Sequence, residues 1–284
     1  MRALKPVAFL AFTAVVGLGL PGDVISSFQV GSGLGVIPWG GPYRDGPGGN
    51  VFVVWQRSVM PATVYISEFT VAGSLIRSVT IPGIDSCLDV DATHFGQGYI
   101  GLGVKPPREL RIYETGGLTC VASWPLLDYS YCNFFWDGEY YHFGYNYGWH
   151  QRRFYTYTST GSFVGTMKYG GYPGRVPMGG AGFTNNFGGA VGSFTVIATN
   201  FSPYGTFVIN HVTGSLVSCW PNPGHWPNYG ASCGPGFPAS YGTTFWGSYA
   251  EPDSRSNVWV YQVDLGNSVS VSPASLGRIK ALYR

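Results

Sequence analysis

The chain has 284 residues, of which 45% are hydrophobic and 17% aromatic, whereas only 11% are charged and the net charge is +2. This length allows a large core, and the weak net charge argues against binding to nucleic acid through its phosphates. So few charges leave a surface made largely of Ser, Thr, Asn, Gly and Tyr. Such a surface suits a protein that packs against copies of itself or that binds sugars.

The N-terminus has the pattern of a secretory signal peptide. Arg2 and Lys5 precede an apolar run over residues 6–20, which is short of the roughly 20 residues needed to span a bilayer. We therefore predict a signal peptide over 1–21 and one mature domain over 22–284, secreted to the extracellular space or the cell surface. No membrane span remains after cleavage. A retained membrane anchor is the alternative interpretation.

A short phrase recurs along the rest of the chain, in which a glycine ends one strand-like run and begins another. Its six glycines are separated by 43 to 53 residues, a period typical of four-stranded propeller blades. Sustained helical periodicity is absent after residue 21, so the sequence predicts an all-β chain. The phrases begin at Gly22, Gly73, Gly116, Gly161, Gly214 and Gly266.

Between these phrases lie runs rich in aromatic and β-branched residues, which predict three further strands per interval. In the third interval, Asp137-Gly138 is a favoured hairpin turn between two strands. Five sets of three strands predict a five-bladed β-propeller of four-stranded antiparallel blades. The expected strands include 88–95, 99–104, 110–114, 131–136, 140–145, 153–158, 242–249 and 257–263, with further inner strands within 37–44, 179–187 and 231–240.

Six outer-strand phrases serve only five blades, so one terminal strand is surplus. Either 23–30 or 267–272 closes the ring, and the other is available to pair with its own blade or with a neighbouring copy. We take the N-terminal segment as the assembly strand, and a C-terminal strand with alternating Ile279, Ala281 and Tyr283 as a second one. The assembly strand comprises Asp23, Val24, Ile25, Ser26, Ser27, Phe28, Gln29 and Val30.

Several of these motifs resemble those of secreted propeller-repeat proteins of environmental bacteria. They are Pro-Gly-Asp-Val-Ile-Ser-Ser-Phe after the signal peptide, the hairpin Phe-Trp-Asp-Gly-Glu-Tyr-Tyr around Asp137, and the ending Ser-Leu-Gly-Arg-Ile-Lys-Ala-Leu-Tyr-Arg. The resemblance covers nearly the whole mature chain at the level of architecture. It implies export and a propeller fold, and it assigns no catalytic residue.

Five cysteines in an exported chain favour disulfides. Cys120 with Cys132, and Cys219 with Cys233, occupy matching places two blades apart, so we predict these two pairs and leave Cys87 unpaired. Pairing of Cys87 with Cys132 is the alternative. The cysteines lack the close spacing of a zinc site.

Carboxylates and histidines give weak support for catalysis. Asp89 and Asp91 lie on one predicted inner strand and are the best carboxylate pair, but the other inner strands supply no acid to face them. A glycoside hydrolase is therefore a remote alternative, and a calcium ion is the only metal these two residues suggest. The five histidines are scattered singly, and no cofactor motif occurs.

Aromatic side chains are the remaining candidates for ligand contact. The proline-rich loop between Trp220 and Tyr229 presents Trp226, and exposed aromatic rings stack on sugars and on other proteins. The sequence thus predicts a non-catalytic extracellular structural or adhesive protein whose partners are copies of itself, joined by terminal-strand addition into filaments. A monomeric carbohydrate-binding propeller is the alternative.

Overall fold

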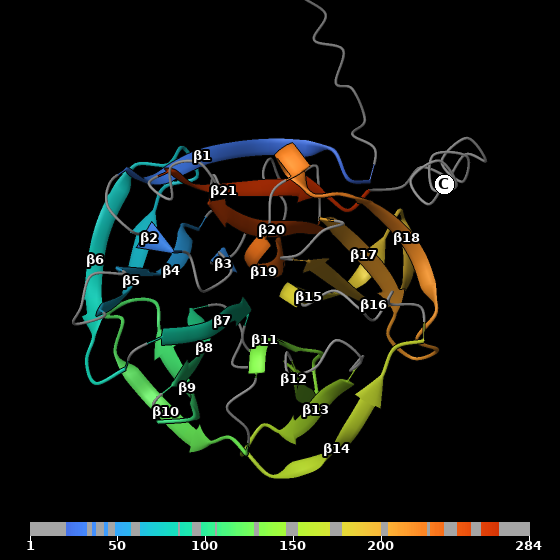
Figure 1. Ribbon diagram of the computed structural model, residues 1–284, viewed down its shortest axis with the longest axis horizontal. Helices are drawn as coiled ribbons and strands as arrows, with labels where there is room; N and C mark the ends of the chain where they lie inside the picture. The colour runs from blue at the N-terminus through green and yellow to red at the C-terminus, as the bar shows by residue number, and fades with distance from the viewer. Residues whose placement is uncertain are drawn as a thin grey trace, which may run out of the picture.

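The structure is a computed structural model, and it describes residues 21–32, 36–37, 43–44, 49–57, 63–84, 86–92, 98–105, 107–127, 131–145, 153–170, 178–199, 204–225, 228–235, 243–250 and 257–266. Five antiparallel sheets surround a central axis as the blades of a β-propeller (Figure 1). The predicted fold class is confirmed.

Each blade runs from an inner strand beside the axis to an outer strand at the rim (Figure 1). Blade 1 contains β2 (Val36–Ile37), β3 (Tyr43–Arg44), β4 (Val51–Arg57), β5 (Thr63–Phe69) and β6 (Leu75–Ile81). Blade 2 contains β7 (Ser86–Ala92), β8 (Tyr99–Lys105), β9 (Glu109–Glu114) and β10 (Cys120–Pro125). Blade 3 contains β11 (Tyr131–Trp136), β12 (Tyr140–Tyr145), β13 (Arg153–Thr158) and β14 (Phe163–Lys168).

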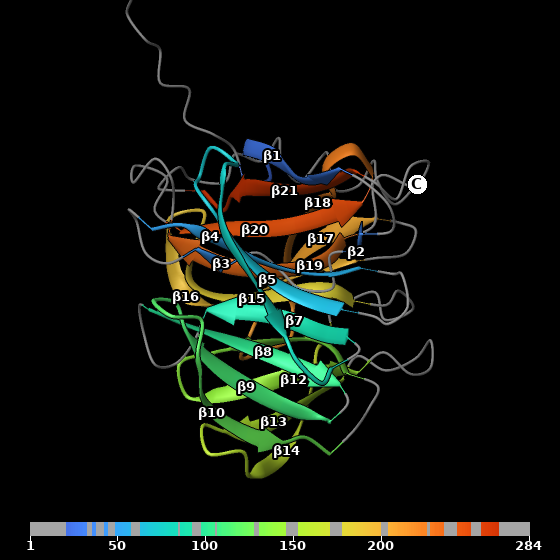
Figure 2. The same ribbon diagram turned by 90° about the vertical axis from the view of Figure 1, so that its left-hand side faces the viewer.

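Blade 4 contains β15 (Met178–Phe187), β16 (Ala190–Thr199), β17 (Gly205–Asn210) and β18 (Leu216–Pro221). Blade 5 contains β19 (Asn228–Pro235), β20 (Thr243–Ala250) and β21 (Asn257–Asp264), completed by β1 (Val24–Ser32) from the other end of the chain. A 3-10 turn, η1 (Pro223–His225), joins blades 4 and 5. Neighbouring strands are antiparallel, and the turn between β11 and β12 meets the turn between β17 and β18 at one end of the ring, which we call the hairpin face. Figure 2 shows the ring from the side.

The N-terminal strand closes the ring. β1 pairs with β21 of the same chain from Val24 opposite Val263 to Ser32 opposite Asn257. Phe28 is 8% exposed and packs with residues of blade 1. The prediction that residues 23–30 form a free assembly strand is therefore corrected. The strand hydrogen-bonds to the edge of β21, and its Phe28 packs against apolar residues of blade 1. The competing strand at 267–272, and the predicted C-terminal strand, lie outside the described residues.

The core consists of five apolar clusters, one at each joint between successive blades. Propeller blades bury both faces of their sheets, and each cluster here combines residues of two neighbours. At the joint of blades 2 and 3, for example, Leu110 and Ile112 pack with Phe134, Tyr141 and Phe143. Among the described residues, the ring is thus held by an apolar cluster at every joint.

The recurrent glycine marks the turn before each outer strand. Gly161, with φ of 86°, lies where an added Cβ would be 2.5 Å from Cγ of Trp124 in the preceding blade. The same approach occurs between Gly22 and Trp220 and between Gly73 and Phe28. In blade 2 the left-handed residue is Leu118, with φ of 54°, so the turn lies two residues later than the Gly116 of the sequence phrase.

Candidate functional sites

Every outer strand contains a bulge that carries a β-branched residue, and this residue is exposed in four of the five strands and half-buried in β1. Each outer strand has a register shift against its neighbour near its first residues, leaving one extra residue unpaired. A bulge breaks the alternation of side chains, so two successive residues face outward. The extra residue is Ile25, Ile76, Val121, Val164 or Val217.

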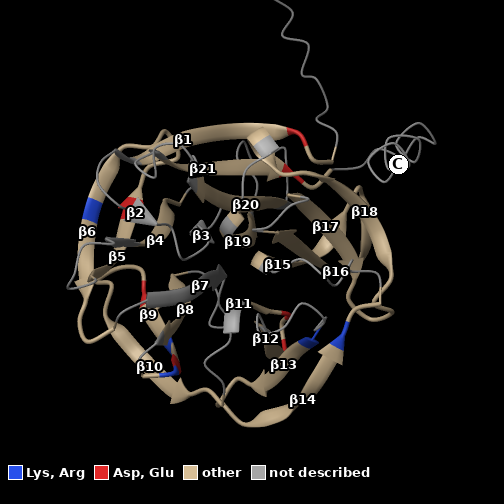
Figure 3. Cartoon of the chain, viewed as in Figure 1, with Lys and Arg blue, Asp and Glu red and all other residues tan. Residues whose placement is uncertain are grey.

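These residues give the ring an apolar rim. Ile76 is 49% exposed, Val121 52% and Val164 53%, and the residue before the bulge is apolar as well in four of the five strands. Only Arg77 of β6 and Lys168 of β14 supply charge on the outer strands, and Figure 3 shows how few charged residues follow the rim. We call this set the apolar rim: Val24, Ile25, Leu75, Ile76, Cys120, Val121, Phe163, Val164, Leu216 and Val217.

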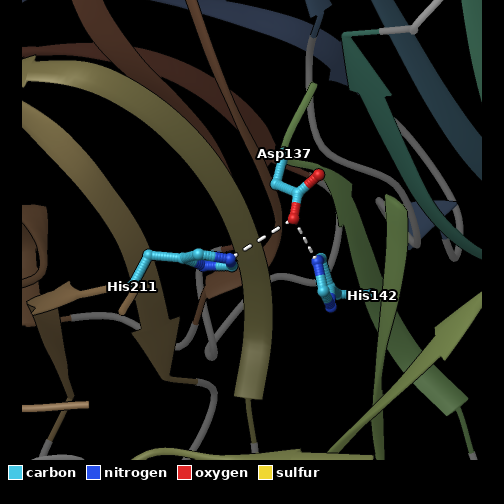
Figure 4. Close-up of side chains that lie close together, drawn as sticks. All are labelled: Asp137, His142 and His211. Carbon is cyan, nitrogen blue, oxygen red and sulfur yellow. Dashed lines mark hydrogen bonds and ion pairs between the residues drawn. The ribbon is translucent and has the colours of Figure 1, made fainter. Parts of the chain in front are cut away.

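A second candidate site lies on the hairpin face, between blades 3 and 4. Asp137 follows β11, His142 lies on β12, and His211 begins the turn after β17 (Figure 4). Oδ2 of Asp137 lies 2.6 Å from Nε2 of His142 and 3.3 Å from Nε2 of His211. One carboxylate oxygen of blade 3 therefore joins an imidazole of its own blade to an imidazole of the next.

The other atoms of this triad are also held. Oδ1 of Asp137 accepts hydrogen bonds from the backbone N–H groups of Glu139 and Tyr140, at 2.8 and 2.7 Å. This is the turn geometry that aspartate favours in a hairpin. The carboxylate is thereby oriented with Oδ2 toward the two histidines.

Hydroxyl groups face the far side of both imidazoles. Nδ1 of His142 lies 3.1 Å from Oγ1 of Thr156. Nδ1 of His211 lies 2.9 Å from the hydroxyl of Tyr169 and 3.0 Å from Oγ1 of Thr195. Because a hydroxyl can donate or accept, these contacts suit either tautomer of each ring.

Burial sets the charges of the triad. His142 is 3% exposed, and burial lowers its pKa despite the hydrogen bond to Asp137. Burial alone would raise the pKa of Asp137, but hydrogen bonds from His142, His211 and the backbone of Tyr140 hold that pKa well below its ordinary value. The site at neutral pH is therefore a carboxylate facing a neutral His142.

Sequence reasoning placed Asp137 in its hairpin turn correctly but treated the histidines as isolated residues. His142 and His211 belong to different blades, and only the closure of the joint brings them together. The available signal was positional: both lie near the ends of strands that lead to the same face. Among the described residues, these three form the group of His, Cys, Asp and Glu side chains whose ligand atoms all lie within 4.8 Å of one another.

The predicted disulfides are wrong. Cys120 is an exposed thiol on an outer strand, so it does not pair with Cys132 of the inner strand β11. Cys219 faces the joint of blades 3 and 4, whereas Cys233 faces the joint of blades 4 and 5, and they form no disulfide. Inner and outer strands at successive sequence positions are separated by the width of a blade. The side chains of Cys87 and Cys132 lie outside the described part of the chain.

Trp220, a predicted ligand contact, is a core residue. It is 9% exposed and stacks on Phe187 at 6.3 Å between ring centroids. Trp226 and the side chain of Tyr229 lie outside the described residues, so the sugar-binding interpretation stays a prediction. Asp89 and Asp91 do lie on the inner strand β7, with a register shift between Cys87 and Val90, but their side chains are likewise not described.

Comparison with known proteins supports the fold alone. Scans against protein families and curated proteins find no match. The structure is similar to the glutaminyl cyclase of Myxococcus xanthus, with a TM-score of 0.56, 9% identity, and coverage of 86% of this chain and 97% of that one. It also aligns with a chain of the mitotic checkpoint complex at 12% identity and a TM-score of 0.48, covering 95% and 90% of the two chains.

The one helical element among the described residues, η1, has three residues. No described helix is long and apolar enough to cross a membrane.

Proposed function

We propose that the chain is a non-catalytic extracellular structural protein whose rings associate with one another through the apolar rim. The observation that supports this most directly is the repetition of a β-branched bulge residue in every blade, exposed in four of the five. The four exposed bulge positions could accommodate a polar residue with little loss of packing, yet all five bulge residues are Ile or Val. An exposed apolar residue at one place is ordinary, whereas four of them at matching places around a ring point to a contact surface.

The edges of the outer strands supply the other half of the contact. Each outer strand presents unpaired backbone groups along its outer side, and proteins usually protect such edges with lysines. β1, β10 and β18 contain no charged residue at all. Two identical edges can pair antiparallel about a twofold axis, with the apolar residues packed across the join.

In this proposal, the contact between copies is made by the edges of the blades and not by a donated terminal strand. β1 is engaged in its own ring, so the remaining donor in the chain is the segment after Gly266. A donated tail and an edge-to-edge contact predict different behaviour on truncation, and one experiment separates them.

Sedimentation velocity over a range of protein concentrations tests the proposal. We expect the parent chain to associate, and a Val24→Lys/Val121→Lys/Val217→Lys variant, which places charge on the three uncharged edges, to sediment as a monomer. The matched control is Val212→Lys, because Val212 is 82% exposed but lies in a turn before β18. This control should associate like the parent.

Two outcomes would overturn the edge contact. One is a parent chain that stays monomeric at every concentration. The other is a chain truncated after Gly266 that becomes monomeric while the lysine variant still associates, which would make the C-terminal tail the donor.

A further inference from the structure

The triad of Asp137, His142 and His211 has the composition of a metal site. Two imidazole nitrogens and one carboxylate oxygen are ligands that zinc accepts, whereas calcium and magnesium prefer oxygen throughout. Three protein ligands leave one tetrahedral position for water. The Asp137 and His211 side chains are 11% and 14% exposed, so an ion has a route from solvent.

The spacing is close to that of a zinc centre. With zinc–ligand distances of about 2.0–2.1 Å, neighbouring donor atoms of a tetrahedral site lie roughly 3.3 Å apart. Oδ2 of Asp137 and Nε2 of His211 are already 3.3 Å apart. The 2.6 Å separation from Nε2 of His142 has to widen by roughly 0.7 Å, which a small rotation of the Asp137 carboxylate provides.

The surroundings hold both rings with Nε2 directed inward. A histidine that binds metal through one nitrogen usually donates its other N–H to an oxygen, which fixes the ring. Here Thr156 lies beside Nδ1 of His142, while Tyr169 and Thr195 lie beside Nδ1 of His211. Without metal, Nε2–H of each ring donates to the carboxylate. With metal, the proton sits on Nδ1 and is donated to a hydroxyl.

Aromatic rings enclose the site on both sides. Phe135 stacks on His142 at 4.9 Å between centroids, and Phe183 meets the ring of His211 edge to face at 5.2 Å. The two histidine rings are themselves 5.2 Å apart in a T-shaped arrangement. Few rotamers are open to either ring, so the ligands are arranged before an ion arrives.

We propose that Asp137, His142 and His211 bind one zinc-class divalent ion that fastens blade 3 to blade 4 at the hairpin face. Asp137 and His142 belong to blade 3 and His211 to blade 4, so the ion bridges the joint. Its role is structural: the three ligands come together only in the folded ring, so the ion binds the folded state more tightly than the unfolded chain and thereby stabilises the fold. The site is distinct from the apolar rim and does not depend on it.

The test uses the full chain, freed of metal with a chelator, then titrated with Co²⁺ and separately with Zn²⁺ in competition with a chromophoric chelator. We expect one ion per chain, the visible absorption of tetrahedral Co²⁺, and a melting temperature that rises and saturates with Zn²⁺. In His211→Gln and Asp137→Asn, zinc affinity should fall at least tenfold. Asparagine keeps the oxygen that accepts from Glu139 and Tyr140. His225→Gln serves as the matched control and should bind as the parent does.

The proposal is overturned if the parent shows neither the Co²⁺ spectrum nor competition for Zn²⁺ up to about 100 μM, a concentration well above that of specific structural zinc sites. It is also overturned if His211→Gln binds as tightly as the parent. Circular dichroism without metal checks that each variant is folded. If a variant does not fold, the Co²⁺ spectrum of the parent alone decides whether the metal site exists.

Discussion

The joint between blades 2 and 3 and the joint between blades 3 and 4 solve one packing problem in two ways. The first is apolar, with Trp124 against Gly161 and a cluster of aromatic rings beneath. The second adds a polar layer of Asp137, His142 and His211 above its apolar cluster. The difference teaches that a propeller joint needs complementary surfaces rather than one kind of contact, and that a polar joint can hold chemistry as well.

The largest effect is expected at the apolar joint. Gly161→Ala should cost about 2–5 kcal/mol of unfolding free energy, combining about 1–2 kcal/mol for a left-handed backbone with about 1–3 kcal/mol for overpacking against Trp124. Urea unfolding measures it. Two glycines serve as controls: Gly83→Ala has positive φ but open space, so it should lose only the backbone part, and Gly165→Ala should change little. Equal losses at Gly161 and Gly83 would show that Trp124 imposes no constraint.

At the polar joint, Tyr169→Phe should destabilise by about 1–3 kcal/mol, because the buried hydroxyl that meets Thr195 and His211 is removed. The matched variant at the apolar joint is Tyr157→Phe, whose hydroxyl accepts from the backbone N–H of Leu127. We expect the smaller loss there. If chemical unfolding finds the reverse order, the hydroxyl network does not support the polar joint.

The joint of blades 1 and 2 can be changed by mutation to resemble the joint of blades 2 and 3, in which a tryptophan packs against a glycine. Val79, at the place of Trp124, packs on the cluster that contains Leu118, while Arg77 donates to the carbonyls of Thr115 and Gly116. Leu118→Gly should destabilise by about 1–2 kcal/mol, since the lost burial exceeds the relieved backbone strain.

Adding Val79→Trp to Leu118→Gly should recover part of that loss and give a favourable coupling of about 0.5–3 kcal/mol in a double-mutant cycle. Strictly additive effects of the two changes would mean that this joint does not share the packing of blades 2 and 3.

The smallest effect, and the one that depends on pH, is expected where β1 meets β21 and closes the ring. Burial raises the pKa of Asp264, the hydrogen bond from the backbone of Gly266 opposes this, and the charge of Asp23 adds to the rise. The folded state therefore holds this proton more tightly than the unfolded state, so the carboxyl costs stability at neutral pH. That cost disappears as pH falls through the folded pKa toward the ordinary value near 3.8.

Asp264→Asn should thus stabilise the ring by up to about 1 kcal/mol at pH 7, since asparagine still accepts from Gly266. The advantage over the parent should shrink as pH is lowered to 4. Thermal melts of both proteins across this range provide the measurement, and an advantage that grows toward acid pH would contradict the assignment.

The repeat made much of the fold predictable. The period gave five blades, and the hairpin at Asp137-Gly138 gave the strands on either side of it with the bounds that the structure has. The outer strand that follows Gly116 was predicted, but the shift of its turn to Leu118 was not. A leucine adopts a positive φ because of packing against the neighbouring blade, which local sequence propensity does not reveal.

Sites that span two blades could not be predicted in the same way. The bulges that expose Ile76 or Val164 depend on strand register, which a sequence of alternating residues does not reveal. His142 and His211 meet only across a joint. The disulfide pairs failed for the related reason that residues near in sequence, at the outer strand of one blade and the inner strand of the next, lie a blade's width apart, one at the rim and the other beside the axis.

Closure by β1 also determines the order in which the ring can be completed. The first described strand has its partner, β21, at the far end of the described chain, and each of its hydrogen bonds must wait until all five blades have been synthesised. Phe28 stays exposed until then, and the edge of β21 stays exposed from its synthesis until β1 pairs with it. Such long-range pairing slows folding and leaves the open ring prone to association. The same strand that seals the finished molecule therefore keeps the unfinished one open to neighbours.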